Sequence, residues 1–184
     1  MQLLGRYLPL TRAAPWISSG PVNAAEDKYD TLSFAYALDE PDPWRAVPED
    51  ERRSRGVLGT DSCTIDGRHH FVRGRIVIPV IGSEAPFIWG VWASVSKADF
   101  ERFGRLWDLK IRDHEAPLAG RLGNDIPLYP QTFDLACRVV FKNERRRPSF
   151  ELEATDHPLA IEQRNGITLN RVEEIAAAVQ RHSA

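Results

Sequence analysis

The feature of this sequence that most constrains its fold is the pair Asp66-Gly67, which lies between two stretches of alternating apolar residues. Asp-Gly favours a two-residue turn with positive φ at both positions, and such turns join antiparallel strands. The alternation predicts strands over 57–65 and 69–80, and Pro79 marks the end of the pairing or an edge. The sequence therefore predicts an antiparallel hairpin over residues 57–80.

Further strands and helices follow this hairpin. The segment FIWGVWASVS, residues 87–96, is apolar at both parities, which favours a central strand that is covered on both faces or faces a groove. Residues 133–142 and 150–153 alternate and predict a second hairpin around the loop NERRRP. A capping pattern that starts at Ser96 predicts a helix of about three turns. Thr168 caps a last helix that carries one apolar stripe.

These elements predict an α+β fold, in which a mostly antiparallel sheet of about five strands has two or three helices packed on it. Residues 1–42 lack clear periodicity and predict an irregular N-terminal arm, with a candidate edge strand over 32–38. Residues 43–184 predict a single α+β domain, because 184 residues is about the length of one domain. Residues 110–131 predict a long loop rich in Pro and Gly, and loops of this length often carry function.

Composition and charge narrow the range of functions. The 24 basic and 26 acidic side chains leave a net charge of −2, so the surface as a whole does not favour nucleic acid or an anionic membrane. The three arginines 145–147 follow Glu144 at a hairpin tip, which is more typical of a solvated turn than of a nucleic-acid contact. No apolar run approaches the roughly eighteen residues of a membrane span. The two cysteines form no Cys-x-x-Cys pair, which is typical of a reduced protein, so a cytoplasmic location is expected.

The stretch whose side chains are best suited to catalysis or metal binding is Thr155-Asp156-His157-Pro158. An aspartate beside a histidine can orient a general base or supply metal ligands, and Asp61 in the first hairpin could join them. The alternative is a turn, in which the aspartate bonds its own backbone and the proline keeps the preceding residue extended. The catalytic residues are therefore unknown, with Asp156, His157 and Asp61 as candidates. Two histidines in the hairpin point to opposite faces of their strand, so no metal site is predicted, and no cofactor is named.

Five residues are candidates for ligand contact. The guanidinium of Arg164 could clamp a carboxylate or phosphate, and a pair with a nearby glutamate is the alternative. Trp89 and Trp92 have opposite parity on one strand, so at most one of them enters the main core, and the other needs a helix, the 110–131 loop or a partner to cover it. Together with Tyr129 they could line a groove. Arg73 lies on the polar face of the strand over 69–80.

Four longer strings resemble the bacterial domain family DUF2199. They are DSCTIDGRHHFVRGRIVIPVIG, FIWGVWASVS, LYPQTFDL and RPSFELEATDHPLAIEQRNGIT. The similarity covers residues 42–180 and so most of the 43–184 domain, and because the family is one of unknown function, it implies no particular activity. Members often carry a Cys-x-x-Cys-Gly segment that resembles half of a zinc site. The nearest segment here is 16–20, which has no cysteine or histidine, so any metal that relatives bind there is expected to be absent.

Two classes of function stay open. The leading hypothesis is a non-enzymatic binding or protein-interaction module, whose partner is a protein or a small ligand of unknown identity. The alternative is an enzyme that uses the Asp156 and His157 pair, with Arg164 anchoring an anionic substrate. The chain lacks the Gly-x-Ser-x-Gly, Gly-x-Gly-x-x-Gly, phosphate-loop and His-Glu-x-x-His motifs, so the familiar hydrolase, nucleotide and zinc-protease routes lack their residues. A membrane is not expected as a partner, and nucleic acid is disfavoured.

Overall fold

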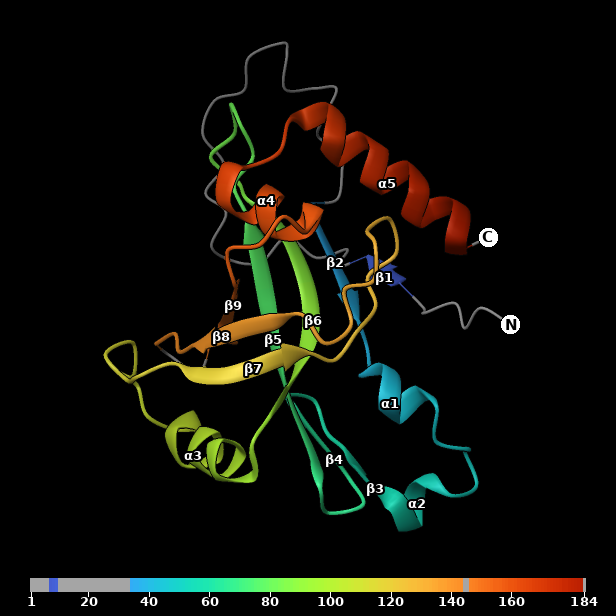
Figure 1. Cartoon of the computed structure of the whole chain (residues 1–184), viewed down its shortest axis with the longest axis vertical. Helices are drawn as coiled ribbons and strands as arrows, with labels where there is room; N and C mark the ends of the chain where they lie inside the picture. The colour runs from blue at the N-terminus through green and yellow to red at the C-terminus, as the bar shows by residue number, and fades with distance from the viewer. Residues whose placement is uncertain (1–6, 10–33, 144–145, 184) are drawn as a thin grey trace.

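The computed structural model describes residues 7–9, 34–143 and 146–183, which form a mixed sheet with helices packed on it (Figure 1). The strands are β1 Tyr7–Pro9, β2 Ala35–Leu38, β3 Gly56–Leu58, β4 Ser62–Ile65, β5 His69–Ile78, β6 Phe87–Val95, β7 Leu118–Leu122, β8 Ala136–Val140 and β9 Ser149–Leu152. The helices are α1 Asp42–Arg45, α2 Arg52–Arg55, α3 Lys97–Trp107, α4 Pro158–Asn165 and α5 Leu169–Ser183. The predicted α+β class is confirmed.

Five of the strands close into a barrel. Their order is β6, β7, β8, β9 and β5, and β5 then pairs with β6 to complete the ring. The β5–β6 contact is the longest of the barrel, with nine residue pairs from His70↔Val95 to Ile78↔Phe87. The β5–β9 contact is the shortest, with the single pair Arg75↔Ser149. Beyond the ring, β2 and β1 continue the sheet from β6, while β4 and β3 continue it from β5.

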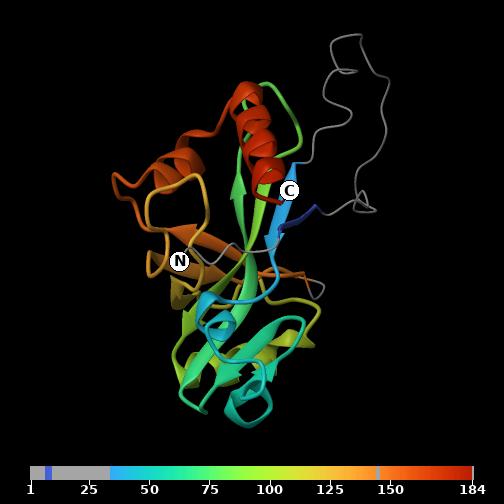
Figure 2. The same ribbon diagram turned by 90° about the vertical axis from the view of Figure 1, so that its right-hand side faces the viewer.

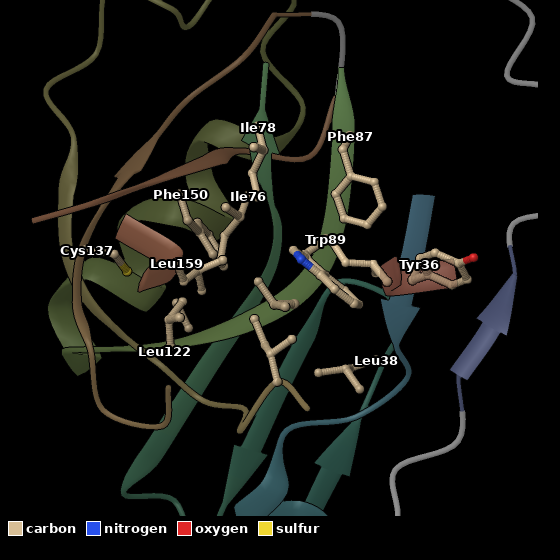
Figure 3. Close-up of a cluster of buried hydrophobic side chains, with 14 of the residues drawn as sticks. Tyr36, Leu38, Ile76, Ile78, Phe87, Trp89, Leu122, Cys137, Phe150 and Leu159 are labelled. Atoms are coloured by element: carbon tan, nitrogen blue, oxygen red, sulfur yellow. The ribbon is translucent and has the colours of Figure 1, made fainter. Parts of the chain in front are cut away.

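The inside of the barrel holds the main hydrophobic core. Ile76 and Ile78 of β5 are fully buried there, as the predicted alternation requires, and Gly74 precedes them on the same face. A side chain at position 74 would overlap the ring of Phe150, which comes from β9. Figure 3 shows how side chains from these strands meet Leu159 of α4 in the interior. The absence of a side chain at Gly74 therefore allows β5 and β9 to pack closely.

A second, smaller core lies on the other face of β5 and β6. It consists of Trp44, Val47, Cys63, Ile65, Phe71 and Trp92. The indole of Trp92 is fully buried there, and its Nε1 donates to the carbonyl of Leu38 at 3.1 Å. Both faces of β6 are thus covered around Trp92, as its apolar residues at both parities predicted, whereas Ile88 on the outer face lines a pocket. The cover on this second face comes from β4 and α1.

The helices cap the two ends of the barrel. Figures 1 and 2 place α4 and α5 at one end, with α2 and the β3–β4 hairpin at the other. The predicted caps of α3 and α5 are confirmed, because the hydroxyl oxygen of Ser96 accepts from the backbone N–H of Asp99, and that of Thr168 accepts from Arg171. Helix α4 was not predicted. None of the described helices is long and apolar enough to cross a membrane.

The sheet is mostly antiparallel, as predicted, but it is mixed and extends beyond the predicted five strands. The pairings β2–β6 and β5–β9 are parallel. The predicted strand over 57–65 is divided by a turn into β3 and β4, and the predicted loop over 110–131 contains β7. Strand β2 lies within the predicted irregular arm, of which residues 1–6 and 10–33 are outside the described part. Strands of three to five residues contain too few alternations to stand out from loops.

The loops that flank α3 and β8 are held together by one buried arginine. Only 1% of Arg112 is exposed. Its guanidinium donates to four backbone carbonyls, those of Lys142 (2.6 Å), Leu106 (3.3 Å), Trp107 (3.2 Å) and Arg146 (2.8 Å). In the reverse direction, the side-chain carbonyl of Asn143 accepts from the backbone N–H groups of Arg112 and Asp113. Arg112 therefore ties the backbone at Lys142 and at Arg146 to the end of α3.

Replacing Gly74 with alanine should destabilise the barrel, because the added methyl group displaces the ring of Phe150. Overpacking of this kind costs about 1–3 kcal/mol of unfolding free energy. Urea unfolding of Gly74→Ala measures this loss. The control is Gly104→Ala, since Gly104 lies in α3 with nothing near its Cβ position, and this change should stabilise the protein by about 0.5–1 kcal/mol. Equal effects from the two substitutions would contradict the packing argument.

Replacing Arg112 with alanine should lower the free energy of unfolding by about 3 kcal/mol, because several buried carbonyls lose their donor together. Hydrogen exchange of the backbone amides in residues 142–147 should accelerate beyond the global loss. Arg105→Ala is the matched control, since Arg105 is exposed on α3 and its loss should change stability by less than about 0.5 kcal/mol. An Arg112→Ala protein as stable as the control would refute the role assigned to this guanidinium.

Candidate functional site

The barrel is open along one seam, between β5 and β9. Beyond the pair Arg75↔Ser149 these two strands have no further ladder contact. Helix α4 covers the seam instead, and the amide of Gln163 replaces the missing strand partner. Its oxygen accepts from the backbone N–H of Leu152 at 2.8 Å, and its nitrogen donates to the carbonyl of Phe150 at 2.7 Å. The backbone of β9 is thereby satisfied while β5 and β9 separate.

A pocket of about 730 Å³ lies over this seam. Its lining comes from β5, β6 and β9, from the loop after β8, and from α4. The lining residues are Arg75, Val77, Pro86, Ile88, Lys142, Arg146, Ser149, Phe150, Glu151, Leu152, Gln163 and Arg164. Four of them are cationic and one is anionic. We call this the seam pocket, and its volume is in the range of pockets that hold small molecules.

The centre of its charge is Arg75, in the middle of β5. The Nε atom of Arg75 is buried and has no hydrogen-bond partner among the described residues. No carboxylate of the described chain forms an ion pair with it, and burial followed by repulsion from Arg146 and Arg147 lowers its pKa. A desolvated guanidinium without a counter-charge is costly, which is the condition that an anionic ligand relieves.

The predicted ligand contact Arg73 also has a buried Nε without a hydrogen-bond partner among the described residues, but its guanidinium has other partners that Arg75 lacks. It lies two residues earlier on the same face of β5 and is held within the protein. Its guanidinium donates to the carbonyl of Leu38 at 3.2 Å, lies 3.7 Å from a carboxylate oxygen of Asp39, and stacks 5.6 Å from the ring centroid of Trp92. Arg73 therefore fastens the end of β2, whereas Arg75 faces the pocket.

The other cations of the seam pocket are similarly unpaired. Lys142, Arg146 and Arg164 form no ion pair with a carboxylate of the described residues, and Arg164 donates only to the backbone carbonyl of Thr155, at 3.0 Å. The one acid of the lining, Glu151, faces Arg138 across the β8–β9 ladder, with 3.8 Å between Nη1 and Oε2. The pocket therefore carries an excess of positive charge that the carboxylates of the described residues do not neutralise.

The predicted catalytic pair lies outside the lining of this pocket. His157 is the N-cap of α4, and its Nδ1 accepts from the backbone N–H of Leu159 at 3.2 Å. This bond places the ring proton on Nε2, which lies 3.3 Å from the carbonyl of Pro130. Both ring nitrogens thus bond backbone groups. Asp156 is exposed, and the turn is closed by the hydroxyl of Thr155 rather than by the aspartate.

The third catalytic candidate, Asp61, belongs to a different contact. It lies in the turn between β3 and β4, and its Oδ1 accepts from Nε of Arg147 at 2.6 Å. None of the described contacts joins it to Asp156 or His157. The four residues of the enzyme hypothesis are therefore not brought together in one pocket, and of the four only Arg164 lines the seam pocket.

The predicted aromatic groove is filled by the protein itself. Trp89 lies in the main core and Trp92 in the second core, and both are 0% exposed, so neither indole can contact a ligand at the surface. Their opposite parity was predicted correctly, but helices and strands of the same chain provide the cover. Tyr129 donates its hydroxyl proton to Glu162 at 2.6 Å, which ties its loop to α4. Burial raises the pKa of this phenol.

Metal and thiol chemistry find no support in the described part of the chain. No three His, Cys, Asp or Glu side chains of residues 34–143 and 146–183 lie close enough to hold a metal ion. Segment 16–20, where relatives carry Cys-x-x-Cys-Gly, lies outside the described residues. Cys63 and Cys137 are unpaired and buried, and burial raises the pKa of each thiol to about 12. Neither is a nucleophile at neutral pH.

Sequence reasoning missed three of the four cations of the seam pocket. Arg75 lies two residues after Arg73 on the same polar face, and no pattern in the sequence distinguishes the two arginines. Lys142 and Arg146 flank a loop that resembles any solvated hairpin tip. The sequence feature that could have indicated the pocket is Arg75 in the middle of a strand, because a charged side chain there needs either a partner or a ligand.

Comparisons with known proteins agree with the resemblance noted in the sequence. Residues 23–167 match the model of a family described as an uncharacterized protein conserved in bacteria, DUF2199. No curated protein and no solved structure matches the chain. The match spans more than half of the 184 residues, from before β2 to the end of the β9–α4 segment, and it includes every residue that lines the seam pocket. The chain therefore belongs to the DUF2199 family.

Proposed function

We propose that this protein is a binding module that holds a small anionic ligand in the seam pocket. The observation that carries the proposal is Arg75, whose buried Nε lacks a partner among the described residues in a pocket lined by three further cations. A bound anion would supply the counter-charge and the hydrogen-bond acceptors that the chain leaves out. The arginine fork would bind the anion in two-point geometry, while Lys142 adds a point charge.

Binding fits this pocket better than catalysis does. The described lining offers one acid, Glu151, and no histidine or cysteine, so a general base for an enzyme is limited to a single exposed carboxylate. His157 caps α4, Asp156 is exposed, and both lie outside the lining. The enzyme hypothesis would need those groups to move to the ligand.

A small ligand also fits better than a protein partner. The large apolar side chains that are exposed among the described residues lie on the edge strand β3, on α4 and in loops, not on β6. The aromatic residues that could have formed a docking surface are inside the two cores. A cytoplasmic location remains part of the proposal, since two unpaired cysteines suit a reducing compartment.

Replacing Arg75 with methionine, which keeps the apolar stem but removes the charge, should abolish anion binding. Calorimetric titration with inorganic phosphate should show binding to the wild-type protein and none to Arg75→Met. At about ten times the dissociation constant, phosphate should raise the melting temperature of the wild type by about 3 °C relative to chloride of equal ionic strength. Arg105→Gln, which removes an exposed charge on α3, should retain the wild-type response.

The same variant tests the cost of the unpaired charge. In chloride alone, Arg75→Met should be at least as stable as the wild type, because a half-buried guanidinium whose buried Nε has no described hydrogen-bond partner is removed. If phosphate shifted all three proteins equally, the effect would be general and the pocket would not be an anion site. A wild type that did not respond to phosphate at all would count against the proposal directly.

A further inference from the structure

We infer that the ligand of the seam pocket is an organic phosphate monoester whose apolar body lies along β5 and β6. This inference rests on the proposed anion site and adds the chemistry of the rest of the ligand. It comes from the distribution of side chains within the pocket. The register of β5 and β6 places the cation Arg75 two residues from the apolar pair Val77 and Ile88, so a ligand that contacts both has two chemically different ends.

The apolar part of the lining is formed by outward-facing residues of the barrel. Val77 of β5 and Ile88 of β6 are cross-strand neighbours on the outer face, and both are half-buried. Pro86 precedes Ile88 on the same side of β6, and Leu152 of β9 completes the wall. Adjacent β-branched side chains form a continuous apolar surface. The side chains of Val77 and Ile88 line the pocket and are only half-buried, so part of this surface is accessible to a ligand.

The cationic part lies one step further along β5. Arg75 pairs with Gly90 of β6, two residues beyond the Val77↔Ile88 pair, and it contacts Ser149 of β9 through the only ladder position at the seam. Arg146 is near enough to lower the pKa of Arg75 by repulsion. The charged and apolar parts are thus separated by about two residues of strand, or about 7 Å, which is the length of a phosphate joined to one ring or short chain.

The number of cations favours phosphate over carboxylate. Arg75, Arg146 and Lys142 line this part of the pocket, and a monoanionic carboxylate would leave most of their charge uncompensated. A phosphate monoester carries a charge of about −1.5 to −2 at pH 7 and offers three acceptor oxygens, so it can bond two guanidinium groups and an ammonium together. The hydroxyl of Ser149, which also lines the pocket, is a further available donor.

Phenyl phosphate is the probe that tests the inference, with inorganic phosphate, benzoate and phenol as its separate parts. Titration calorimetry on the full chain should show phenyl phosphate binding at least about tenfold more tightly than inorganic phosphate, since the ring loses contact with water on the apolar wall. Benzoate should bind more weakly than phenyl phosphate by a similar factor. Phenol, which has no anionic group at neutral pH, should not bind measurably.

Two variants of the apolar wall assign the effect to this pocket. Ile88→Gln should remove the tenfold advantage of phenyl phosphate while the affinity for inorganic phosphate changes by less than about twofold. Val77→Thr changes a methyl group to a hydroxyl at nearly constant volume, so it keeps the test valid if Ile88→Gln fails to fold, and it should lower the advantage about threefold. Arg75→Met should abolish the binding of both phosphates.

The possible results distinguish the proposed anion site from the proposed apolar body of its ligand. If neither phosphate binds, the proposed anion site itself is wrong. If inorganic phosphate binds and phenyl phosphate gains nothing, or gains equally in Ile88→Gln, the anion site stands and the apolar body is refuted. If benzoate equals phenyl phosphate, the ligand is an organic carboxylate and the assignment to a phosphate monoester is overturned.

Discussion

The antiparallel ladder between β5 and β6 is the contact on which both cores and the seam pocket depend. Its nine residue pairs place one set of side chains inside the barrel and the opposite set outside. Along its first part the outer face is covered by β4 and α1, which bury Phe71 and Trp92. Along its last part the outer face is left open and carries Arg75, Val77 and Ile88. The outer face of these two strands is thus buried in its first part, while its last part is accessible and carries both charged and apolar side chains.

The seam exists because β9 is too short and too divergent to follow β5. A fully paired barrel would place a neighbouring strand beside Val77 and leave little space for a ligand. Instead the strands separate after Arg75↔Ser149, and Gln163 of α4 bonds the free backbone of β9. One amide side chain thereby satisfies the polar groups that an open barrel would otherwise leave unpaired. The opening is a stable part of the fold, and Arg112 fixes the loop along its rim.

The sequence was most informative where elements were long and regular. The Asp66-Gly67 hairpin, the two-faced strand β6 and the caps at Ser96 and Thr168 were predicted correctly because each depends on neighbouring residues only. The candidate edge strand over 32–38 contains β2, although β2 lies between β1 and β6 rather than at an edge, and the predicted strand over 57–65 contains most of β3. Strand β7 was missed, since pairing with distant strands defines it. The residues of the seam pocket were not predicted for the same reason. Which arginine is paired and which is free depends on what lies across the fold, and spacing along the chain does not contain that information.

The electrostatics of β5 show why the free arginine is informative. Arg73 and Arg75 share a face, a strand and a residue type, yet the acid at position 39 and a backbone carbonyl compensate only the first. Had selection acted on stability alone, a methionine or leucine at position 75 would fill the same space without the cost of desolvating a charge. Under the proposed function, the charge of Arg75, together with Arg146 and Lys142, serves a bound anion. An anion that binds only the folded protein would then offset the cost of desolvating this guanidinium.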